Sequence, residues 1–192
     1  MAVDRDIFIF CNIIRSRSEE NRKAIATLSR CGSVVIGPSF SILRQELDSM
    51  VRVVYLLNIS SLSERKRLIK QTLSGEQWTT RTEKGRERKI TDKEMIDITN
   101  NLYGWTLSVY KFGCSFIHLS NFHNYLSENP VSMLRDNEKE DIIHHMKHYY
   151  GYHSDTLDVQ RIWPYIPSIF DKISGNLHYY IEGLQNNSTS SL

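Results

Sequence analysis

The chain has 192 residues, of which 40% are hydrophobic and 24% are charged, and its formal net charge at pH 7 is +2. A chain of this length buries about 70% of the surface that it exposes when unfolded, so a core needs neither metals nor disulfides. This composition excludes a largely disordered chain, and the small net charge excludes a surface that is basic throughout. Any basic surface must therefore be local.

The cysteines and the first residues favour a cytoplasmic protein. The three cysteines, Cys11, Cys31 and Cys114, form no CxxC pair, which argues against a disulfide framework and a zinc knuckle. Two early acidic residues are atypical of a secretory signal. The longest apolar run, residues 53–57, is far shorter than the roughly 20 residues of a membrane helix. We expect free thiols, no cofactor and no membrane association.

Two long helices are expected at the start of the chain. Residues 3–30 place apolar side chains at helical spacing, with charged residues between them. A glycine and a proline at residues 37–38 predict a turn, and a second helix follows to residue 57. This second helix has a wide apolar face, which indicates that it is buried.

A short helix and a charged insertion are expected next. Ser61 and Glu64 have the spacing of a capping box, which predicts a helix to about Leu73. The helical pattern stops over residues 74–90, which are rich in charge and poor in apolar side chains. We interpret this stretch as a loop, with a short hairpin around residues 77–81 as the alternative.

A second capping box, Thr91 to Glu94, predicts a long helix that continues to about residue 119. A further helix is expected over residues 137–150.

The last expected helix begins after Ser154 or Asp155 and is interrupted near two prolines. The polar residues 185–192 are expected to form a disordered tail. The predicted fold is all-α: an irregular antiparallel helical bundle, residues 1–184, in a single domain with a charged loop or hairpin inserted at about 74–90.

The second helix carries the first candidate site. Arg44, Asp48 and Arg52 are four residues apart and therefore share one face. One interpretation is a ladder of ion pairs on a partly solvated face. The other is that Arg44 binds an anion in a cleft while Asp48 holds its guanidinium in place.

A second candidate site lies at the end of the long helix. His118 follows Phe116 and Ile117, which is unusual company for an imidazole. Lys111 lies two helical turns earlier on the same face. His118 is either a hydrogen-bonded core residue or a general acid or base, with Lys111 or Arg44 supplying positive charge.

The stretch from Glu64 to Lys89 holds nine basic residues against four acidic ones. Basic side chains around an aromatic ring are typical of surfaces that bind single-stranded nucleic acid. The alternative is a solvated loop with its tryptophan folded against the bundle. The candidate nucleic-acid-binding residues are Trp78, Arg81, Lys84, Arg86, Arg88 and Lys89.

His144 and His148 are one helical turn apart, which is a spacing that two ligands of one metal ion can have. The glutamate of a zinc-protease HExxH motif is missing, so we interpret this face as solvated and expect no metal site.

The pairing of Leu43-Arg-Gln-Glu-Leu-Asp48 with a later Ser115-Phe-Ile-His118 resembles a little-characterised group of bacterial helical proteins. That group is similar in outline to the HEPN superfamily. The resemblance implies a homodimer that acts as a metal-independent ribonuclease in a toxin–antitoxin or phage-defence system. HEPN sites carry an arginine and, after four to six residues, a histidine. Six residues separate Lys111 from His118, and lysine stands where the family has arginine.

Two hypotheses follow for the function. In the first, the protein binds or cleaves RNA: His118 takes the proton from a ribose 2′-hydroxyl, Arg44 and Lys111 neutralise the phosphate, and the insertion holds the strand. In the second, it is a non-catalytic partner or regulator of another protein, and both Arg44 and His118 are structural.

Overall fold

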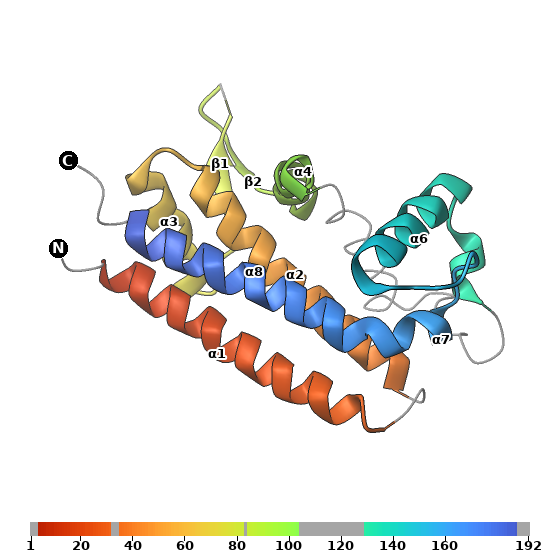
Figure 1. The fold of residues 1–192 in the computed structure, drawn as a ribbon. Helices are drawn as coiled ribbons and strands as arrows, with labels where there is room; N and C mark the ends of the chain where they lie inside the picture. The colour runs from red at the N-terminus through yellow and green to blue at the C-terminus, as the bar shows by residue number, and fades with distance from the viewer. Residues whose placement is uncertain (1–3, 32–34, 83, 104–128, 188–192) are drawn as a thin grey trace.

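The computed structural model describes residues 4–31, 35–82, 84–103 and 129–187. It is mostly helical with a small two-stranded hairpin, which confirms the predicted fold class. Figure 1 shows the long helices side by side, with the hairpin and a short helix above them. The elements are α1 (Arg5–Leu28), α2 (Ile36–Asn58), α3 (Leu62–Leu73), β1 (Thr79–Arg81), β2 (Glu87–Lys89), α4 (Asp92–Tyr103), η3 (Pro130–Met133), α6 (Asp136–Tyr150), α7 (Val159–Ile162), η4 (Trp163–Tyr165) and α8 (Ile166–Asn187).

The central helix is α2, which is buried on more sides than its neighbours. Its buried positions include glycine, serine, arginine and glutamate as well as apolar residues. Hydrogen bonds join Arg15 of α1 to Gln185 of α8 and Arg22 to Ser174, so α1 and α8 are antiparallel. Arg17 of α1 bonds to Ser49 of α2, whereas the next residue, Ser18, bonds to the earlier Glu46. Helices α1 and α2 are therefore antiparallel as well. Therefore α2 and α8 run in the same direction beside α1 (Figure 1).

Both predicted helix starts have an N-cap side chain, and the one at Thr91 is a complete capping box. The hydroxyl of Ser61 accepts a hydrogen bond from the backbone N–H of Glu64 at the start of α3. At α4, the hydroxyl of Thr91 accepts from the N–H of Glu94, and the Glu94 carboxylate accepts in return from the N–H of Thr91. These bonds satisfy N–H groups that the first turn of a helix leaves without partners.

Three predicted boundaries were wrong. Helix α2 begins at Ile36, so the glycine and proline lie in its first turn, where proline is tolerated because its nitrogen needs no partner. Helix α7 is capped by Asp158 rather than by Ser154 or Asp155, because the Asp158 carboxylate reaches the next N–H groups of the chain. Helix α8 continues to Asn187, so the first residues of the expected tail are helical.

The long helix predicted after Thr91 is seen as α4 up to Tyr103, and its predicted continuation lies outside the described residues.

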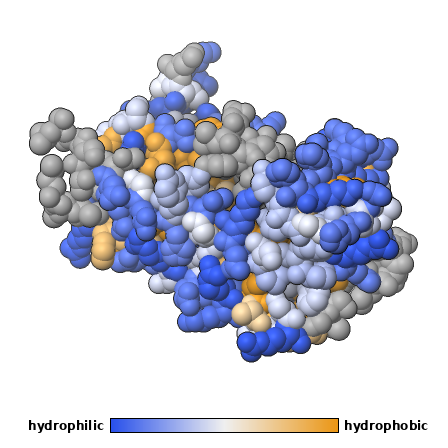
Figure 2. All heavy atoms as spheres, in the orientation of Figure 1, coloured by the Kyte–Doolittle hydropathy of each residue, from blue (hydrophilic) through white to orange (hydrophobic). Residues whose placement is uncertain are grey.

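The hairpin projects from the bundle. Its strands pair antiparallel, with Thr80 opposite Arg88. The turn is closed by Gly85, whose positive φ of 73° suits a residue without a side chain. Hydrophilic residues cover most of the face seen in Figure 2, including the described part of the hairpin. The hairpin therefore presents a polar surface beyond the core.

Candidate functional site

The root of the hairpin is held on α3 by hydrogen bonds. The Arg67 guanidinium donates to the Thr79 hydroxyl at 3.1 Å and also to the Thr79 carbonyl. The Gln71 side chain donates to the same hydroxyl at 2.9 Å and accepts from the Thr79 N–H at 3.2 Å. Glu64 holds Arg67 in place with contacts of 2.6 and 2.8 Å, and this hydrogen bonding holds the pKa of Glu64 below its usual range. The hairpin leaves the bundle in a defined direction.

Trp78 lies just before β1 and is buried, with only 3% of its surface exposed. Its indole N–H donates to the Thr72 hydroxyl at 2.7 Å, and the Arg52 guanidinium lies over its ring at 5.3 Å from the centroid. The Trp78 ring therefore offers little surface on which a nucleic-acid base could stack. The alternative, a tryptophan folded against the bundle, describes what is seen.

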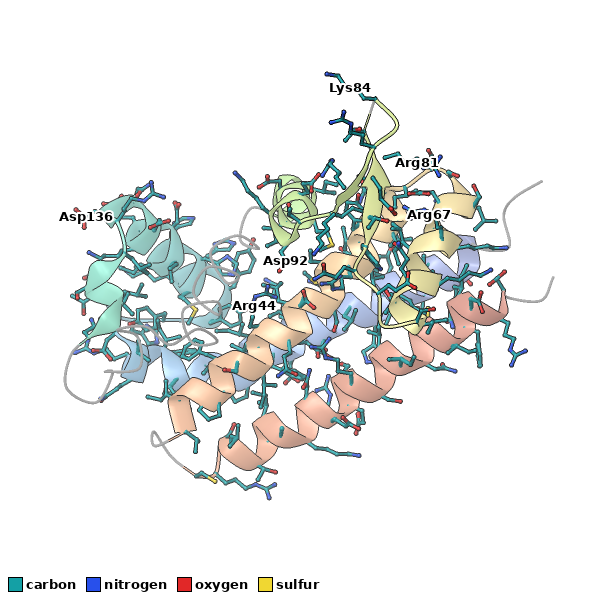
Figure 3. All side chains as sticks on the ribbon, turned by 180° about the vertical axis from the view of Figure 1, so that it is seen from behind. Arg44, Arg67, Arg81, Lys84, Asp92 and Asp136 are labelled. Atoms are coloured by element: carbon teal, nitrogen blue, oxygen red, sulfur yellow. The ribbon has the colours of Figure 1, made fainter. Side chains whose placement is uncertain are left out.

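The tip of the hairpin carries the exposed cations. Arg81, Lys84, Arg86 and Arg88 line an open depression of about 600 Å³ together with two threonines. Figure 3 shows Lys84 at the tip, pointing away from the bundle. Arg88 is paired with Glu94 at 2.6 Å. Among the described residues, no carboxylate forms an ion pair with the other three, which leaves them available to an anion.

The basic residues of this segment thus fall into two sets. On α3 they are used inside the molecule: Lys66 pairs with Asp4 at 2.7 Å, and Arg65 donates to the Ile59 carbonyl at 2.5 Å. In the hairpin, Lys89 is exposed and resembles the tip cations in having no carboxylate partner in the described part of the chain. The local excess of positive charge therefore concentrates on the hairpin.

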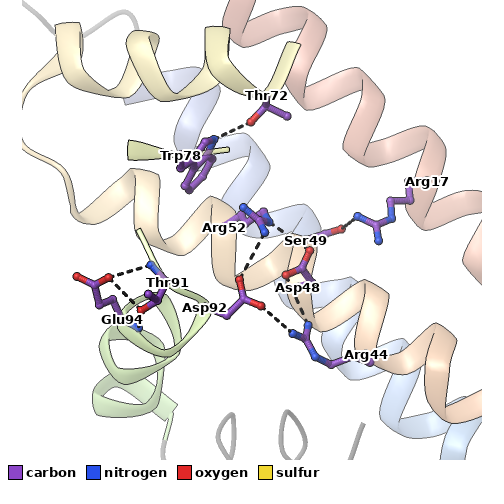
Figure 4. Close-up of polar contacts among 10 residues, drawn as sticks. All are labelled: Arg17, Arg44, Asp48, Ser49, Arg52, Thr72, Trp78, Thr91, Asp92 and Glu94. Atoms are coloured by element: carbon purple, nitrogen blue, oxygen red, sulfur yellow. Dashed lines mark hydrogen bonds and ion pairs between the residues drawn. The ribbon is translucent and has the colours of Figure 1, made fainter. Parts of the chain in front are cut away.

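Arg44, Asp48 and Arg52 form part of a four-membered ion-pair network (Figure 4), whose fourth member is Asp92 at the start of α4. Asp48 lies 3.5 Å from Arg44 and 3.2 Å from Arg52. Asp92 lies 3.5 Å from Arg44 and 3.6 Å from Arg52. Each carboxylate thus contacts both guanidiniums, and the network joins α2 to α4.

The burial of Arg44 bears on its expected role as an anion-binding residue. Arg44 is only 6% exposed, and two carboxylates lie against its guanidinium. A guanidinium in this state offers little surface to a phosphate unless the network opens. The ladder of ion pairs predicted for Arg44, Asp48 and Arg52 is present. It includes the contact between Asp48 and Arg44 that the anion-binding interpretation also predicted.

Sequence reasoning did not identify Asp92, because nothing in the spacing shows that the start of α4 lies beside the middle of α2. In the sequence, Asp92 stands in the first turn of a predicted helix, where the helix dipole already accounts for an acidic residue. Its position therefore did not point to a contact with α2. The ion pair between Arg88 and Glu94 was also not predicted from the sequence. There, the Arg88 hydrogen bond, together with bonds from Thr91, lowers the pKa of Glu94 to about 2.

The other predicted catalytic residues, His118 and Lys111, lie outside the described residues. His144 and His148 stack with their ring centroids 6.3 Å apart. In the part of the chain that the structure describes, no three metal-ligating side chains are grouped closely enough to hold an ion. None of the described helices has the length and apolar character needed to cross a membrane.

Comparisons with known proteins add no assignment. No protein family model, curated protein or solved structure matches this chain.

Proposed function

We propose that this protein binds single-stranded RNA through the hairpin. The observation that carries the proposal is the group of exposed cations at the tip, Arg81, Lys84 and Arg86, which lack carboxylate partners among the described residues. Cations that form no ion pair with a carboxylate of the described residues can neutralise phosphates without first breaking such a pair. A rigid root on α3 supports the tip, so less conformational entropy is lost on binding.

The test is the salt dependence of RNA binding. A labelled single strand of about 12 nucleotides is titrated with the protein between about 50 and 200 mM salt, and binding is followed by fluorescence anisotropy. In the variant with Arg81, Lys84 and Arg86 replaced by glutamine, we expect affinity to fall at least roughly tenfold. The slope of log K against log salt should flatten by up to about 2, since each phosphate contact on a single strand contributes about 0.7.

The matched control replaces Arg135, which precedes α6, and Lys139 and Lys147 of α6 by glutamine. These residues carry the same charge, but each is already paired with a carboxylate. The control should bind RNA nearly as the parent protein does. A parent that binds no single strand at low salt, or a hairpin variant with an unchanged slope, would contradict the proposal.

RNA cleavage is an extension of this proposal and rests on the HEPN resemblance. In that case His118 accepts the 2′-hydroxyl proton, Lys111 neutralises the phosphate, and Arg44 joins it when the network with Asp48 and Asp92 opens. His118→Ala should then abolish cleavage while the variant remains folded, and EDTA should have no effect because no metal takes part. A destabilised His118→Ala variant of a parent that cleaves no RNA would instead support a structural histidine.

The second candidate function is a non-catalytic interaction module, formed with another protein or as a homodimer. The closed ion-pair network favours it, because a buried Arg44 between Asp48 and Asp92 is explained by the docking of α4 on α2. Apolar side chains on the surface of α1 are compatible with such a partner: Phe8 is 51% exposed and Ile13 is 50% exposed. A protein that binds no RNA but elutes as a dimer in size-exclusion chromatography would favour this candidate.

A further inference from the structure

A second pocket lies at the root of the hairpin, on the side of the bundle formed by α1 and α2. Its volume is about 530 Å³, and its walls come from α1, α2, the end of α3 and the residues on both sides of the hairpin. Ligand pockets for small molecules commonly have about 300 to 1,000 Å³. The pocket is therefore large enough for a compound the size of one nucleotide.

One part of the wall is apolar. Ile13 and Ile14 of α1 contribute to it, and both Trp78 and Ile90 contribute from the hairpin root. Ile13 is half exposed although it belongs to this apolar wall. Exposed apolar surface beside a buried aromatic ring favours a flat, weakly polar group over a strongly hydrated one.

Another part of the wall is cationic. Arg17 of α1 donates a long hydrogen bond of 3.4 Å to the Ser49 hydroxyl (Figure 4), and the described residues include no carboxylate paired with it. Lys89, at the end of β2, also lines the pocket and is exposed. Arg52 differs from these two because Asp48 and Asp92 already neutralise it. Two cations that have no carboxylate partner among the described residues therefore face the same space as the apolar wall.

Exposed hydrogen-bonding groups complete the wall. Gln77 offers an amide, which both donates and accepts, and Glu76 offers a carboxylate that accepts. A fatty acid would leave these groups without partners, whereas the edge of a nucleobase presents donors and acceptors of its own. The combination of flat apolar surface, polar edge groups and phosphate-binding cations matches the chemistry of a nucleotide.

We infer that this pocket binds one unpaired nucleotide of the RNA strand that the hairpin tip holds. The base lies against the exposed side chain of Ile13, and the phosphate lies between Arg17 and Lys89. Each strand of the hairpin has three residues and is only about 10 Å long, so one RNA strand can contact both the tip and the pocket at the root. The claim that the nucleotide belongs to an RNA strand rests on the proposed RNA-binding function. Binding of a nucleotide in the pocket can be tested separately with free nucleotides.

The first experiment is calorimetric titration of the parent protein with the four ribonucleoside 5′-monophosphates and, separately, with inorganic phosphate. At least one monophosphate should bind more tightly than phosphate alone. Ile13→Trp should abolish this binding because the larger side chain fills the pocket, and Arg17→Gln should weaken it roughly tenfold by removing a charge-assisted contact.

Matched controls come from the same helix. Ile9→Trp places tryptophan at an exposed position that does not line the pocket, and Arg5→Gln removes an arginine that does not line it either. Both controls should bind the monophosphate as the parent does. Thermal denaturation checks that each variant folds, and Arg17→Gln keeps the test decisive should Ile13→Trp fail to fold.

The second experiment separates this inference from the proposed function. The variant with Arg81, Lys84 and Arg86 replaced by glutamine should bind the monophosphate as the parent does, while the salt slope of its RNA binding flattens. Conversely, Ile13→Trp should lower RNA affinity and flatten the salt slope by no more than about 0.7, the contribution of the one phosphate contact that is lost from the pocket. Absence of monophosphate binding by the parent, equal binding of phosphate alone, or unchanged binding by Ile13→Trp and Arg17→Gln would overturn the inference.

Discussion

His145 on α6 shows how strongly the surroundings of one side chain change its chemistry. Burial, and after it the positive charge of Lys172, lowers the pKa of His145 to about 4. Lys172 itself lies over the ring of Tyr149, with its nitrogen 3.5 Å from the centroid, and burial lowers its pKa too. The ring of His145 is 4.6 Å from that of Tyr149. This packing of α6 on α8 therefore requires a neutral imidazole.

The pKa of His145 predicts a loss of stability at mildly acidic pH. An unfolded chain protonates this histidine near its ordinary pKa of 6.5, whereas the folded chain does so only near 4. Between these values the unfolded state binds more protons, so the contribution is fully present above about pH 6.5 and is lost as the pH falls toward 4. We expect His145 to lower the free energy of unfolding by on the order of 1 kcal/mol between about pH 7 and 5.

Urea denaturation at several pH values measures this effect. His145→Gln should show a smaller decrease in stability over the same range, because it has no proton to bind. His148→Gln is the matched control, since His148 is exposed on the same helix. Identical pH profiles for the parent and His145→Gln would show that the histidine does not stay neutral in the folded protein.

At the scale of elements, one line of contacts connects the hairpin root to α2 and α4. It begins with the Thr72 hydroxyl, continues through Trp78 to Arg52, and ends in the network with Asp48 and Asp92. Neither the hairpin nor α4 has a core of its own. We infer that these contacts, more than local propensity, decide how both elements sit on the bundle.

The network predicts an energetic coupling between α2 and α4. Asp92→Asn should destabilise the protein by about 1 kcal/mol, since Asp92 is 48% exposed and its contacts are long. A double-mutant cycle of Arg52→Gln with Asp92→Asn should give a coupling of about 0.5 to 1 kcal/mol. Asp48→Asn should cost about 1 to 3 kcal/mol, because this more buried carboxylate pairs with both arginines.

Urea denaturation and hydrogen exchange provide the readout for this prediction. Asp92→Asn should speed exchange of the first amides of α4 and of the hairpin more than that of the α2 amides. Asp97→Asn is the control, because Asp97 is an exposed residue of the same helix. If Asp92→Asn and Asp97→Asn behaved alike, the network would have no part in docking α4.

Across the whole molecule, α1, α2 and α8 meet at a buried polar cluster around Glu46. The Glu46 side chain is fully buried and accepts hydrogen bonds from Ser18 at 2.5 Å and from Asn21 at 3.0 Å. The Ser18 hydroxyl also lies 3.1 Å from that of Ser174 on α8. Because a shift of any of the three helices would leave these groups without partners, the cluster specifies how the helices align.

Glu46→Ala should therefore lower the free energy of unfolding by about 2 to 4 kcal/mol, since it opens a cavity and leaves Ser18 and Asn21 without acceptors. Glu46→Gln keeps the shape and one acceptor, so it should cost less than Glu46→Ala. Glu20→Ala, at an exposed position of α1, should change stability by no more than about 0.5 kcal/mol. Chemical denaturation measures all three, and a Glu46→Ala variant as stable as the parent would contradict the proposed role of the cluster.

The sequence by itself determined the local features of this protein: the helical class, the N-caps at Ser61 and Thr91, the hairpin region and the excess of positive charge between Glu64 and Lys89. These follow from side-chain periodicity and from bonds between residues a few positions apart, which a single sequence displays directly. Only the tertiary structure decided which cations are neutralised, that Trp78 is buried, that Asp92 completes the network with Arg44, and that a pocket lies beside the hairpin. Such features depend on contacts between residues far apart in the chain, and burial and pairing are set by what folding brings alongside each side chain.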